Sequence, residues 1–304
     1  MPNNIPIFLS SDNNYAPFVA TTIASICDNT KSFCEFYVLD GGISEENQAK
    51  ICELKKQFYN FSIEFIKIDV EKEFKGFKEN QYITKSMYSR FLIPILKPNI
   101  DKAIYSDVDV IVFGDIKEMF DEDLGGYILG AVPDFKAQDV IFEKHREEIN
   151  LDKNHRFFFS SNLLIDCRRW REKEISARLM DLAISSSHKF KLPDQDIFNL
   201  CFENNYKMLD YKYCYCVAQS VNNPNGKVFI RHFNSQVKPW HINPNTKTNM
   251  MPHLKEFWDY AKLTPFYDEL HQKTLNQIEQ ANTLRALRVV VIANRLSTKI
   301  KAVK

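Results

Sequence analysis

Three aspartate pairs of the form Asp-x-Asp could bind a metal ion: Asp107/Asp109, Asp121/Asp123 and Asp194/Asp196. Two carboxylates can hold one hard cation, which keeps positions free for water and a diphosphate. The first pair lies between the apolar runs AIYS and VIVF, which are typical of strands. If the segment is extended, both carboxylates share one face, and their burial is costly unless a cation compensates. This context favours a metal site at Asp107 and Asp109.

The other two pairs have simpler explanations. Asp121 and Asp123 belong to FDEDLGG, which predicts a solvated acidic turn. Asp194 and Asp196 follow Pro193, and acidic residues in the first turn suit the dipole of a starting helix. Helix capping alone would therefore explain that pair.

A histidine, a lysine and a tryptophan follow one another in the run VFIRHFNSQVKPWH. His232 is expected at the end of a strand, and Lys238 and Trp240 in the loop after it. Two interpretations are open: a structural histidine, or a group that completes a metal and phosphate site.

Apolar runs rich in Ile, Val and Phe predict the strands that must position these groups. The predicted strands are Ile5–Leu9, Glu35–Leu39, Phe61–Ile68, Ala103–Tyr105, Val108–Phe113, Ile128–Val132 and Phe157–Ile165. The predicted helices between and after them are Ala16–Cys27, Glu45–Tyr59, Thr84–Leu96 and Arg168–Ile184. This alternation indicates an α/β fold with a mainly parallel sheet. Ligands bind beyond the carboxyl ends of such strands, so the loop after the first strand is a candidate site, although no GxGxxG occurs.

Composition narrows the class of protein. Among 304 residues, 44% are hydrophobic, which excludes a disordered chain. A net charge of +1 gives no reason to expect a nucleic-acid partner. The first fifteen residues lack a basic region and a long apolar stretch, so we expect no signal peptide. Seven cysteines without a CxxC pair suggest reduced, buried thiols in a cytosolic protein.

Six motifs in order resemble those of family 8 of the nucleotide-sugar glycosyltransferases, which includes lipopolysaccharide galactosyl- and glucosyltransferases and glycogenin. The likeness extends from about residue 5 to about residue 241. The motifs are Ile7–Tyr15, resembling the uridine-holding strand and loop; Tyr88-Ser89-Arg90, resembling Y-x-R; Asp107-Val108-Asp109, resembling D-x-D; Asp134, resembling a donor-sugar carboxylate; Asp194-Gln195-Asp196, resembling D-Q-D; and His232 to Trp240, resembling H-Y-x-G-x-x-K-P-W. The resemblance implies a GT-A-like, Rossmann-type catalytic domain over 1–250 and a C-terminal helical segment over 251–304.

The resemblance also implies roles for individual residues. It implies catalytic roles for Asp194 and Gln195 beside the anomeric carbon, and cation ligation by Asp107, Asp109 and His232. The donor-binding residues that it implies are Ser10, Asp12, Asn14, Tyr15, Arg90, Val108, Asp134, Ser160, Ser235 and Lys238, the last at the diphosphate. An imidazole beside two carboxylates favours Mn²⁺ over Mg²⁺, with Mg²⁺ as the alternative.

The implied reaction is the retaining transfer of a hexose from UDP-glucose or UDP-galactose to a saccharide, as in the lipopolysaccharide or lipooligosaccharide core. Two departures leave the donor sugar open. Phe158–Asn162 stands where the family has a Y-F-N-A-G-like run, and Ser235 replaces a glycine in a chain with only 8 glycines. The alternatives are a UDP-sugar-binding protein with weak or no transfer, a self-glucosylating primer, and a metal-dependent nucleotide-sugar hydrolase.

The last 24 residues, 281–304, carry six basic side chains and no acidic one. Apolar residues recur there at helical spacing, with basic residues on another face. Such a helix suits an anionic membrane surface, where a glycolipid acceptor would lie. We therefore expect a cytoplasmic protein that is peripheral at the inner face of the membrane. A helix that packs on the domain with a solvated basic face is the other interpretation.

Overall fold

The computed structural model describes residues 4–79, 84–134, 140–185, 189–217, 228–234, 238–241 and 253–279. A seven-stranded sheet forms its centre, with strand order β3-β2-β1-β4-β7-β6-β8. β7 runs antiparallel to both of its neighbours, and the other neighbouring strands in this sheet are parallel. The strands are β1 (Ile5–Ser11), β2 (Cys34–Asp40), β3 (Phe61–Lys67), β4 (Lys102–Ser106), β6 (Leu129–Pro133), β7 (Phe158–Asp166) and β8 (Lys207–Met208).

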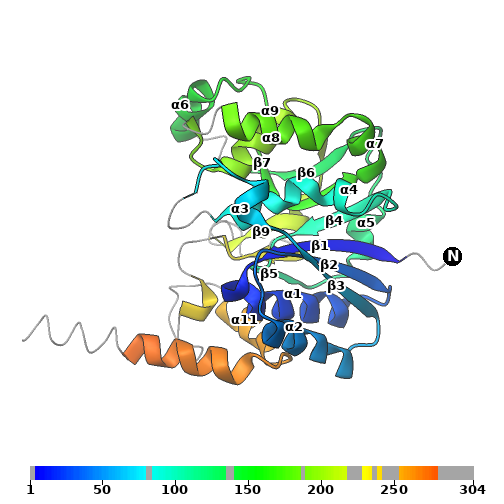
Figure 1. Cartoon of the computed structure of the whole chain (residues 1–304), viewed down its shortest axis with the longest axis vertical. Helices are drawn as coiled ribbons and strands as arrows, with labels where there is room; N and C mark the ends of the chain where they lie inside the picture. Colours follow the sequence, from blue (N-terminus) through cyan, green and yellow to red (C-terminus); the bar gives the residue numbers. More distant parts are fainter. Residues whose placement is uncertain are drawn as a thin grey trace, which may run out of the picture.

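Helices cover both faces of this sheet (Figure 1). The α-helices are α1 (Ala16–Asn29), α2 (Glu45–Cys52), α3 (Val70–Glu73), α4 (Ile93–Leu96), α5 (Lys117–Phe120), α6 (Val140–Glu148), α7 (Cys167–Glu172), α8 (Ile175–Ser185), α9 (Pro193–Cys201) and α11 (Leu254–Ala261), followed by a helix over 267–279. The 3₁₀ helices named here are η1 (Asn13–Tyr15), η2 (Glu53–Lys56), η3 (Lys85–Leu92), η6 (Tyr211–Cys214) and η7 (Pro239–His241).

Two hydrophobic clusters follow from the alternation of side chains along the strands. Ile5, Ile7 and Leu9 of β1 belong to the cluster that includes α1 and α11. Phe8, between them, belongs to the cluster that includes η3 and α7 to α9. The strands are therefore apolar on both faces, which explains the continuous apolar runs in the sequence. The α/β class with a mainly parallel sheet is confirmed.

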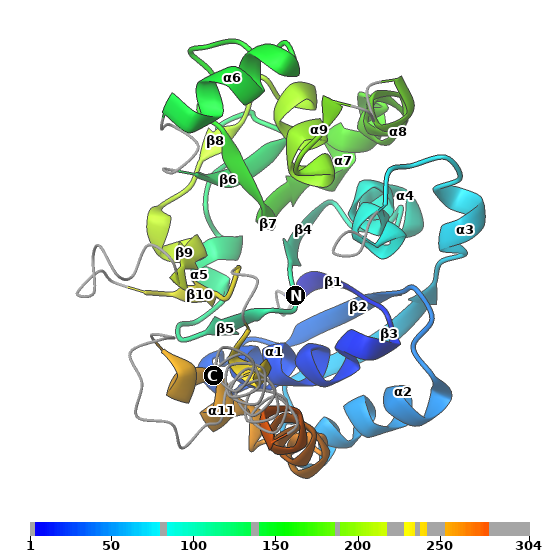
Figure 2. The ribbon, with the colours of Figure 1, turned by 90° about the vertical axis from the view of Figure 1, so that its left-hand side faces the viewer.

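A second, three-stranded sheet has the order β5-β10-β9. Its strands are β5 (Val110–Val112), β9 (Tyr215–Cys216) and β10 (Ile230–His232). Figure 2 shows these strands side by side next to α1. Polar side chains of α1 hold β5 there, because the Thr22 hydroxyl bonds to the carbonyl of Val110 and the Ser25 hydroxyl accepts from the backbone of Val112. The strand predicted to end at His232 is β10.

Six of the seven predicted strands are confirmed in the large sheet, and the exception is Val108–Phe113. Only Val110–Val112 of that run is a strand, and it belongs to the small sheet. The chain bends at residues 108 and 109 as it passes from β4 to β5. The segment through the first aspartate pair is therefore not extended, and strand alternation does not align its two carboxylates.

Three predicted helices differ in detail from those observed. Thr84–Leu96 is mostly 3₁₀ helix, and a short α-helix begins only at Ile93, because Pro94 lacks the N–H that a longer helix would need. Arg168–Ile184 is divided into α7 and α8 at Glu174, whose φ of 50° is left-handed and ends α7. The helix predicted over Glu45–Tyr59 ends at Cys52 and continues as η2.

The C-terminal part of the described chain packs on α1 and β10. Tyr260 of α11 accepts a hydrogen bond from Asn29 of α1 at 2.7 Å, and Glu256 pairs with the buried Arg231 of β10 at 3.0 Å. None of the described helices is long and apolar enough to cross a membrane. The boundary predicted at residue 250 and the basic segment 281–304 lie outside the described residues. The division into two domains therefore stays a prediction.

All seven cysteines are described; none forms a disulfide, and six are buried. The FDEDLGG segment is confirmed as an exposed acidic turn, in which Asp121 pairs with Lys117 and Asp123 accepts from the backbone of Gly125.

The fully buried amide of Asn199 joins α9 to β7. Its nitrogen donates to the carbonyls of Phe158 and Gln195 at 2.9 and 2.8 Å. Its oxygen accepts from the Phe158 backbone at 2.9 Å and lies 2.9 Å from Nε2 of His155. This amide joins α9 to the strand that carries Ser160.

We expect Asn199→Ala to lower the free energy of unfolding by about 2 to 4 kcal/mol, because it leaves several buried polar groups without a partner. Urea denaturation followed by circular dichroism measures this. The control is Asn276→Ala, since Asn276 is exposed and should lose no more than about 0.5 kcal/mol. Equal losses in the two variants would show that Asn199 does not have this role.

Candidate active site

The bend between β4 and β5 brings the carboxylates of Asp107 and Asp109 to one imidazole. His232 Nε2 lies 3.2 Å from Oδ1 of Asp109 and 3.9 Å from Oδ2 of Asp107. Backbone bonds hold the bend on both sides: Asp107 N–H donates to the Ser161 carbonyl at 2.8 Å, and Phe233 N–H donates to the Asp109 carbonyl at 2.9 Å. The two carboxylates and the imidazole thus lie close enough to share one metal ion.

Val108, between the two aspartates, anchors the bend in the core. Its side chain is 7% exposed, and its carbonyl accepts a hydrogen bond from the hydroxyl of Thr22 at 3.0 Å. Val108 therefore fixes the backbone from which both carboxylates project.

Asp109 is surrounded by positive charge. The Lys238 ammonium donates to Oδ2 of Asp109 at 2.6 Å and to the carbonyl of Phe233 at 2.7 Å. Burial favours the neutral acid, but Lys238 and His232 outweigh it and hold the pKa of Asp109 well below its usual range. Burial likewise opposes the imidazolium, yet Asp109 raises the pKa of His232 to about 10. A cation ligated by His232 must therefore displace a proton from the ring.

Asp107 has a different environment. Burial raises its pKa to about 6, against the attraction of Arg90, whose Nη2 lies 3.0 Å away. The Tyr105 hydroxyl also donates to Asp107 at 2.7 Å. The two aspartates therefore differ in proton affinity, and Asp109 holds a proton less tightly than Asp107 does.

Arg90 connects the first aspartate pair to the start of α9. Its guanidinium is buried, with Nη1 3.0 Å from Oδ2 of Asp194 and 2.9 Å from the carbonyl of Ser160. It also lies over the Tyr105 ring at 4.5 Å. One arginine thus fixes the positions of Asp107 and Asp194 together.

The two aspartates of the D-Q-D segment, Asp194 and Asp196, have different partners. Asp194 accepts from the Ser160 hydroxyl at 2.7 Å, and both residues contact Arg90. The Gln195 amide, next in the chain, donates to Asp134 at 3.4 Å. Asp196 is completely buried and holds the backbone before α9. It accepts from the N–H groups of residues 191 and 192, and it lies 2.9 Å from the ring of His145. Both aspartates lie in the first turn of α9 after Pro193, as the capping interpretation predicts, but Asp194 also contacts Arg90 and Ser160.

The loop after β1 reaches the same cluster from the other side. Ser10 donates to the Ser86 carbonyl at 2.7 Å, and Asp12 accepts from the backbone of Asn14 and Tyr15 at the start of η1. Burial raises the pKa of Tyr15, Lys238 lowers it and Asp109 raises it, so the phenol lies within the electrostatic reach of Asp109 and Lys238. Ser235 lies outside the described residues.

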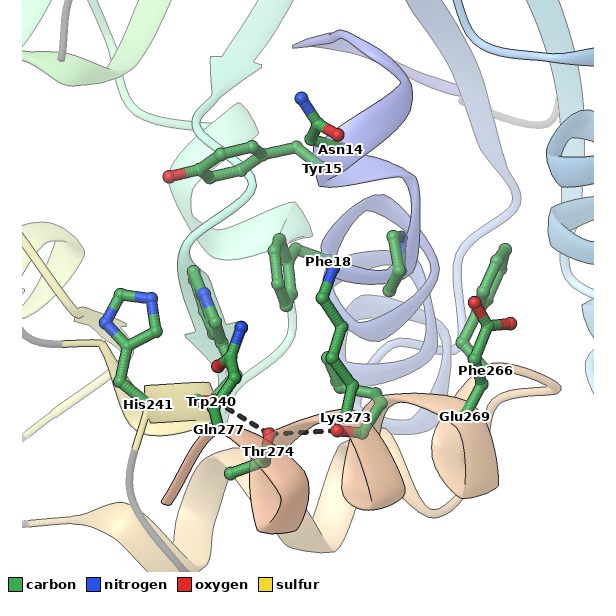
Figure 3. Close-up of a pocket in the computed structure, with 12 residues that line it drawn as sticks. Asn14, Tyr15, Phe18, Trp240, His241, Phe266, Glu269, Lys273, Thr274 and Gln277 are labelled. Atoms are coloured by element: carbon green, nitrogen blue, oxygen red, sulfur yellow. Dashed lines mark hydrogen bonds between the residues drawn. The ribbon is translucent and has the colours of Figure 1, made fainter. Parts of the chain in front are cut away.

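A cavity of about 230 Å³ adjoins this loop but contains none of the carboxylates discussed above. Figure 3 shows it between η1, η7 and the helix over 267–279, lined by Tyr15, Phe18 and Trp240 on one side and by Lys273 on the other. The rings of Phe18 and Trp240 stack with centroids 3.5 Å apart. The cavity therefore neighbours the polar cluster and does not contain it.

Sequence reasoning missed Tyr105, which orients both Asp107 and Arg90. It also missed Cys214 and Cys216, whose sulfurs lie 3.7 and 3.9 Å from Nδ1 of His232. Strand alternation could not have revealed this pair, because Cys214 ends η6 and only Cys216 belongs to β9.

The chain is similar to known proteins in sequence and in fold. The sequence profile described as glycosyl transferase family 8 matches residues 6–243. Glycosyltransferase GlyF of Streptococcus pneumoniae serotype 4 (strain ATCC BAA-334 / TIGR4) is 30% identical over 288 residues, which cover 91% of this chain and 66% of GlyF. The chain thus spans slightly less than two thirds of the length of GlyF. A lipopolysaccharide 1,2-glucosyltransferase of Escherichia coli is 27% identical over 76% of this chain and 71% of its own length.

Among solved structures, the galactosyltransferase LgtC in complex with donor and acceptor sugar analogues superposes with a TM-score of 0.76. It is 23% identical and covers 86% of this chain and 96% of its own. This likeness confirms the GT-A-like fold. With the profile spanning most of the sequence and six motifs in order, the chain belongs to glycosyltransferase family 8.

Proposed function

We propose that this protein is a retaining, metal-dependent hexosyltransferase that moves glucose or galactose from a UDP-sugar to a saccharide. The observation that carries the proposal is the double contact of Arg90, at 3.0 Å from both Asp107 and Asp194. This contact fixes the cation-binding carboxylates relative to the carboxylate and amide at the start of α9. A site for a diphosphate and a site for the sugar attached to it are thus held at a set separation.

The diphosphate side of the site consists of Asp107, Asp109, His232 and Lys238. The first three would hold Mn²⁺, with Mg²⁺ as the alternative, because a mixed oxygen and nitrogen donor set suits manganese better. When bound, the cation would offset the charge that develops on the departing UDP. Lys238 brings another positive charge to the same place, where it would contact the diphosphate. Ser10, Asp12, Asn14 and Tyr15 would bind the uridine at the end of β1.

The sugar side of the site consists of Asp134, Ser160, Asp194 and Gln195. Ser160 and Arg90 both contact Oδ2 of Asp194, so its carboxylate is held in one orientation. Asp134 and Gln195 offer a carboxylate and an amide, which suit sugar hydroxyls. Asp194 and Gln195 would lie against the anomeric carbon. Serine at position 160 is shorter than the asparagine of the family and leaves more room beside the donor sugar.

The proposed acceptor is an oligosaccharide or glycolipid of the lipopolysaccharide or lipooligosaccharide core. Similarity to the lipopolysaccharide 1,2-glucosyltransferase supports this class of acceptor. An acceptor embedded in a membrane would also give a role to the basic residues of 281–304, which would bind the anionic cytoplasmic face.

We expect Asp109→Asn to lower the rate of UDP release by at least about 100-fold, because it removes an anionic ligand of the cation. The assay contains Mn²⁺ and a panel of UDP-sugars, with and without truncated lipooligosaccharide. Asp121→Asn is the matched control, since Asp121 belongs to an exposed Asp-x-Asp pair and should keep full activity. Equal rates in the two variants would overturn the choice of the first pair.

The same assay separates the alternatives. A hydrolase releases free hexose when no acceptor is present. A self-glucosylating primer gains hexose mass, which mass spectrometry of the intact protein detects. A binding protein binds UDP-sugar in calorimetry without releasing UDP. Transfer to the added saccharide is the result expected here.

We expect deletion of 281–304 to reduce binding to vesicles that contain anionic lipid by at least about tenfold, since each basic residue near such a surface contributes about 1 kcal/mol. Co-sedimentation measures the bound fraction, and neutral vesicles serve as the control. Unchanged binding to anionic vesicles would favour a helix that packs on the domain.

A further inference from the structure

A second group of metal-binding side chains lies on the opposite side of the His232 ring from the carboxylates. It consists of Cys214, Cys216 and His232, whose ligand atoms all lie within 4.8 Å of one another. The two cysteines are 0% and 1% exposed and His232 is 6% exposed. The proposed transfer reaction uses neither sulfur.

The small sheet builds this group. β9 runs parallel to β10, and their register places Cys216 directly beside His232. Cys214 ends η6 two residues before Cys216, and its sulfur lies 3.3 Å from the hydroxyl of Ser161. The η6–β9 segment, β10 and β7 thus each bring a side chain to this buried group.

The spacing of these atoms is close to that of a tetrahedral metal site. Zinc binds sulfur at about 2.3 Å and imidazole nitrogen at about 2.1 Å, so a tetrahedral ion holds its sulfur and nitrogen ligands about 3.6 Å apart. The observed distances from Nδ1 of His232 are 3.7 Å to Cys214 and 3.9 Å to Cys216. Both nitrogen–sulfur distances are therefore within a few tenths of an ångström of that value, and a water or the Ser161 hydroxyl would be the fourth ligand.

We propose that Cys214, Cys216 and His232 form a binding site for a soft divalent cation such as Zn²⁺, and that its occupation excludes His232 from the carboxylate site. The two ring nitrogens of His232 face different groups, Nδ1 the sulfurs and Nε2 Asp109. An imidazole that ligates a metal through one nitrogen usually donates the N–H of the other to a carboxylate, a backbone carbonyl or a water. With zinc on Nδ1, the proton stays on Nε2 and bonds to Asp109, so Nε2 has no lone pair for another cation.

The donor atoms determine which cation each site selects. Thiolate and imidazole ligands favour Zn²⁺, whereas carboxylates accept Mn²⁺, which generally binds nitrogen and sulfur ligands more weakly. Zinc should therefore bind the sulfur site and weaken manganese at Asp107 and Asp109. This second consequence rests on the proposed function; the existence of the sulfur site does not.

Cadmium titration of the full chain tests the sulfur site. Cadmium–thiolate bonds absorb in the ultraviolet, and we expect the band to saturate at about one equivalent of Cd²⁺. The Cys214→Ser/Cys216→Ser variant should lose the band, while Cys52→Ser, which replaces the least buried cysteine, should keep it. Absence of the band in the unmodified protein, or an equal band in the double variant, would overturn the site. The cadmium band of the unmodified protein tests the site without any variant. Thermal unfolding checks that the double variant is folded.

Electron paramagnetic resonance of Mn²⁺ tests the exclusion. Without zinc, binding of manganese to the protein reports on the proposed carboxylate site alone. We expect one equivalent of Zn²⁺ to weaken manganese binding at least about tenfold in the unmodified protein and to leave the double cysteine variant unchanged. Equal manganese affinity with and without zinc, in a protein that shows the cadmium band, would overturn the exclusion. Failure of manganese to bind even without zinc would count against the proposed function instead.

Discussion

The buried guanidinium of Arg90 is the interaction on which the rest of the site depends. A buried cation is tolerated only when anions and hydrogen-bond acceptors surround it. Here Asp107, Asp194 and the carbonyl of Ser160 supply them, with the Tyr105 ring beneath. Each partner comes from a different element: the end of β4, the start of α9, and β7. Arg90 therefore couples three parts of the fold, and its own element, η3, must keep its position for any of them to be placed correctly.

Much of the fold could be predicted from the sequence because its strands are apolar on both faces. Ile5–Leu9 and Phe157–Ile165 stand out as apolar runs because they are buried by helices on both sides. Periodicity could not separate α-helix from 3₁₀ helix in residues 84–96, where Pro94 decides the outcome. It also could not find the two-residue strands β8 and β9, which are too short to show alternation and exist only through their neighbours.

Residues of the candidate site could be predicted from the sequence when their side-chain chemistry points to a role. Residues that gain a role only through their neighbours in the folded chain could not. Asp107, Asp109, His232 and Lys238 were selected by type and order, and the structure brings their side chains together. Spacing gave the wrong reason for the aspartate pair: the carboxylates converge through a bend between two sheets, and not through strand alternation. Asp194 and Asp196 look equivalent in the sequence. In the structure Asp194 contacts Arg90 and joins the candidate site, whereas Asp196 holds the backbone before α9.

The position of His232 in the small sheet has a further consequence for how the site can be controlled. An imidazole has two nitrogens but carries only one proton when neutral, so the group that fixes the proton on one nitrogen determines what the other can bind. Carboxylates lie on one side of this ring and thiols on the other. A hard cation at Asp109 and a soft cation at the cysteines therefore need opposite tautomers of the same ring. Because both groups share this one ring, a cation bound on one side determines what the other side can bind.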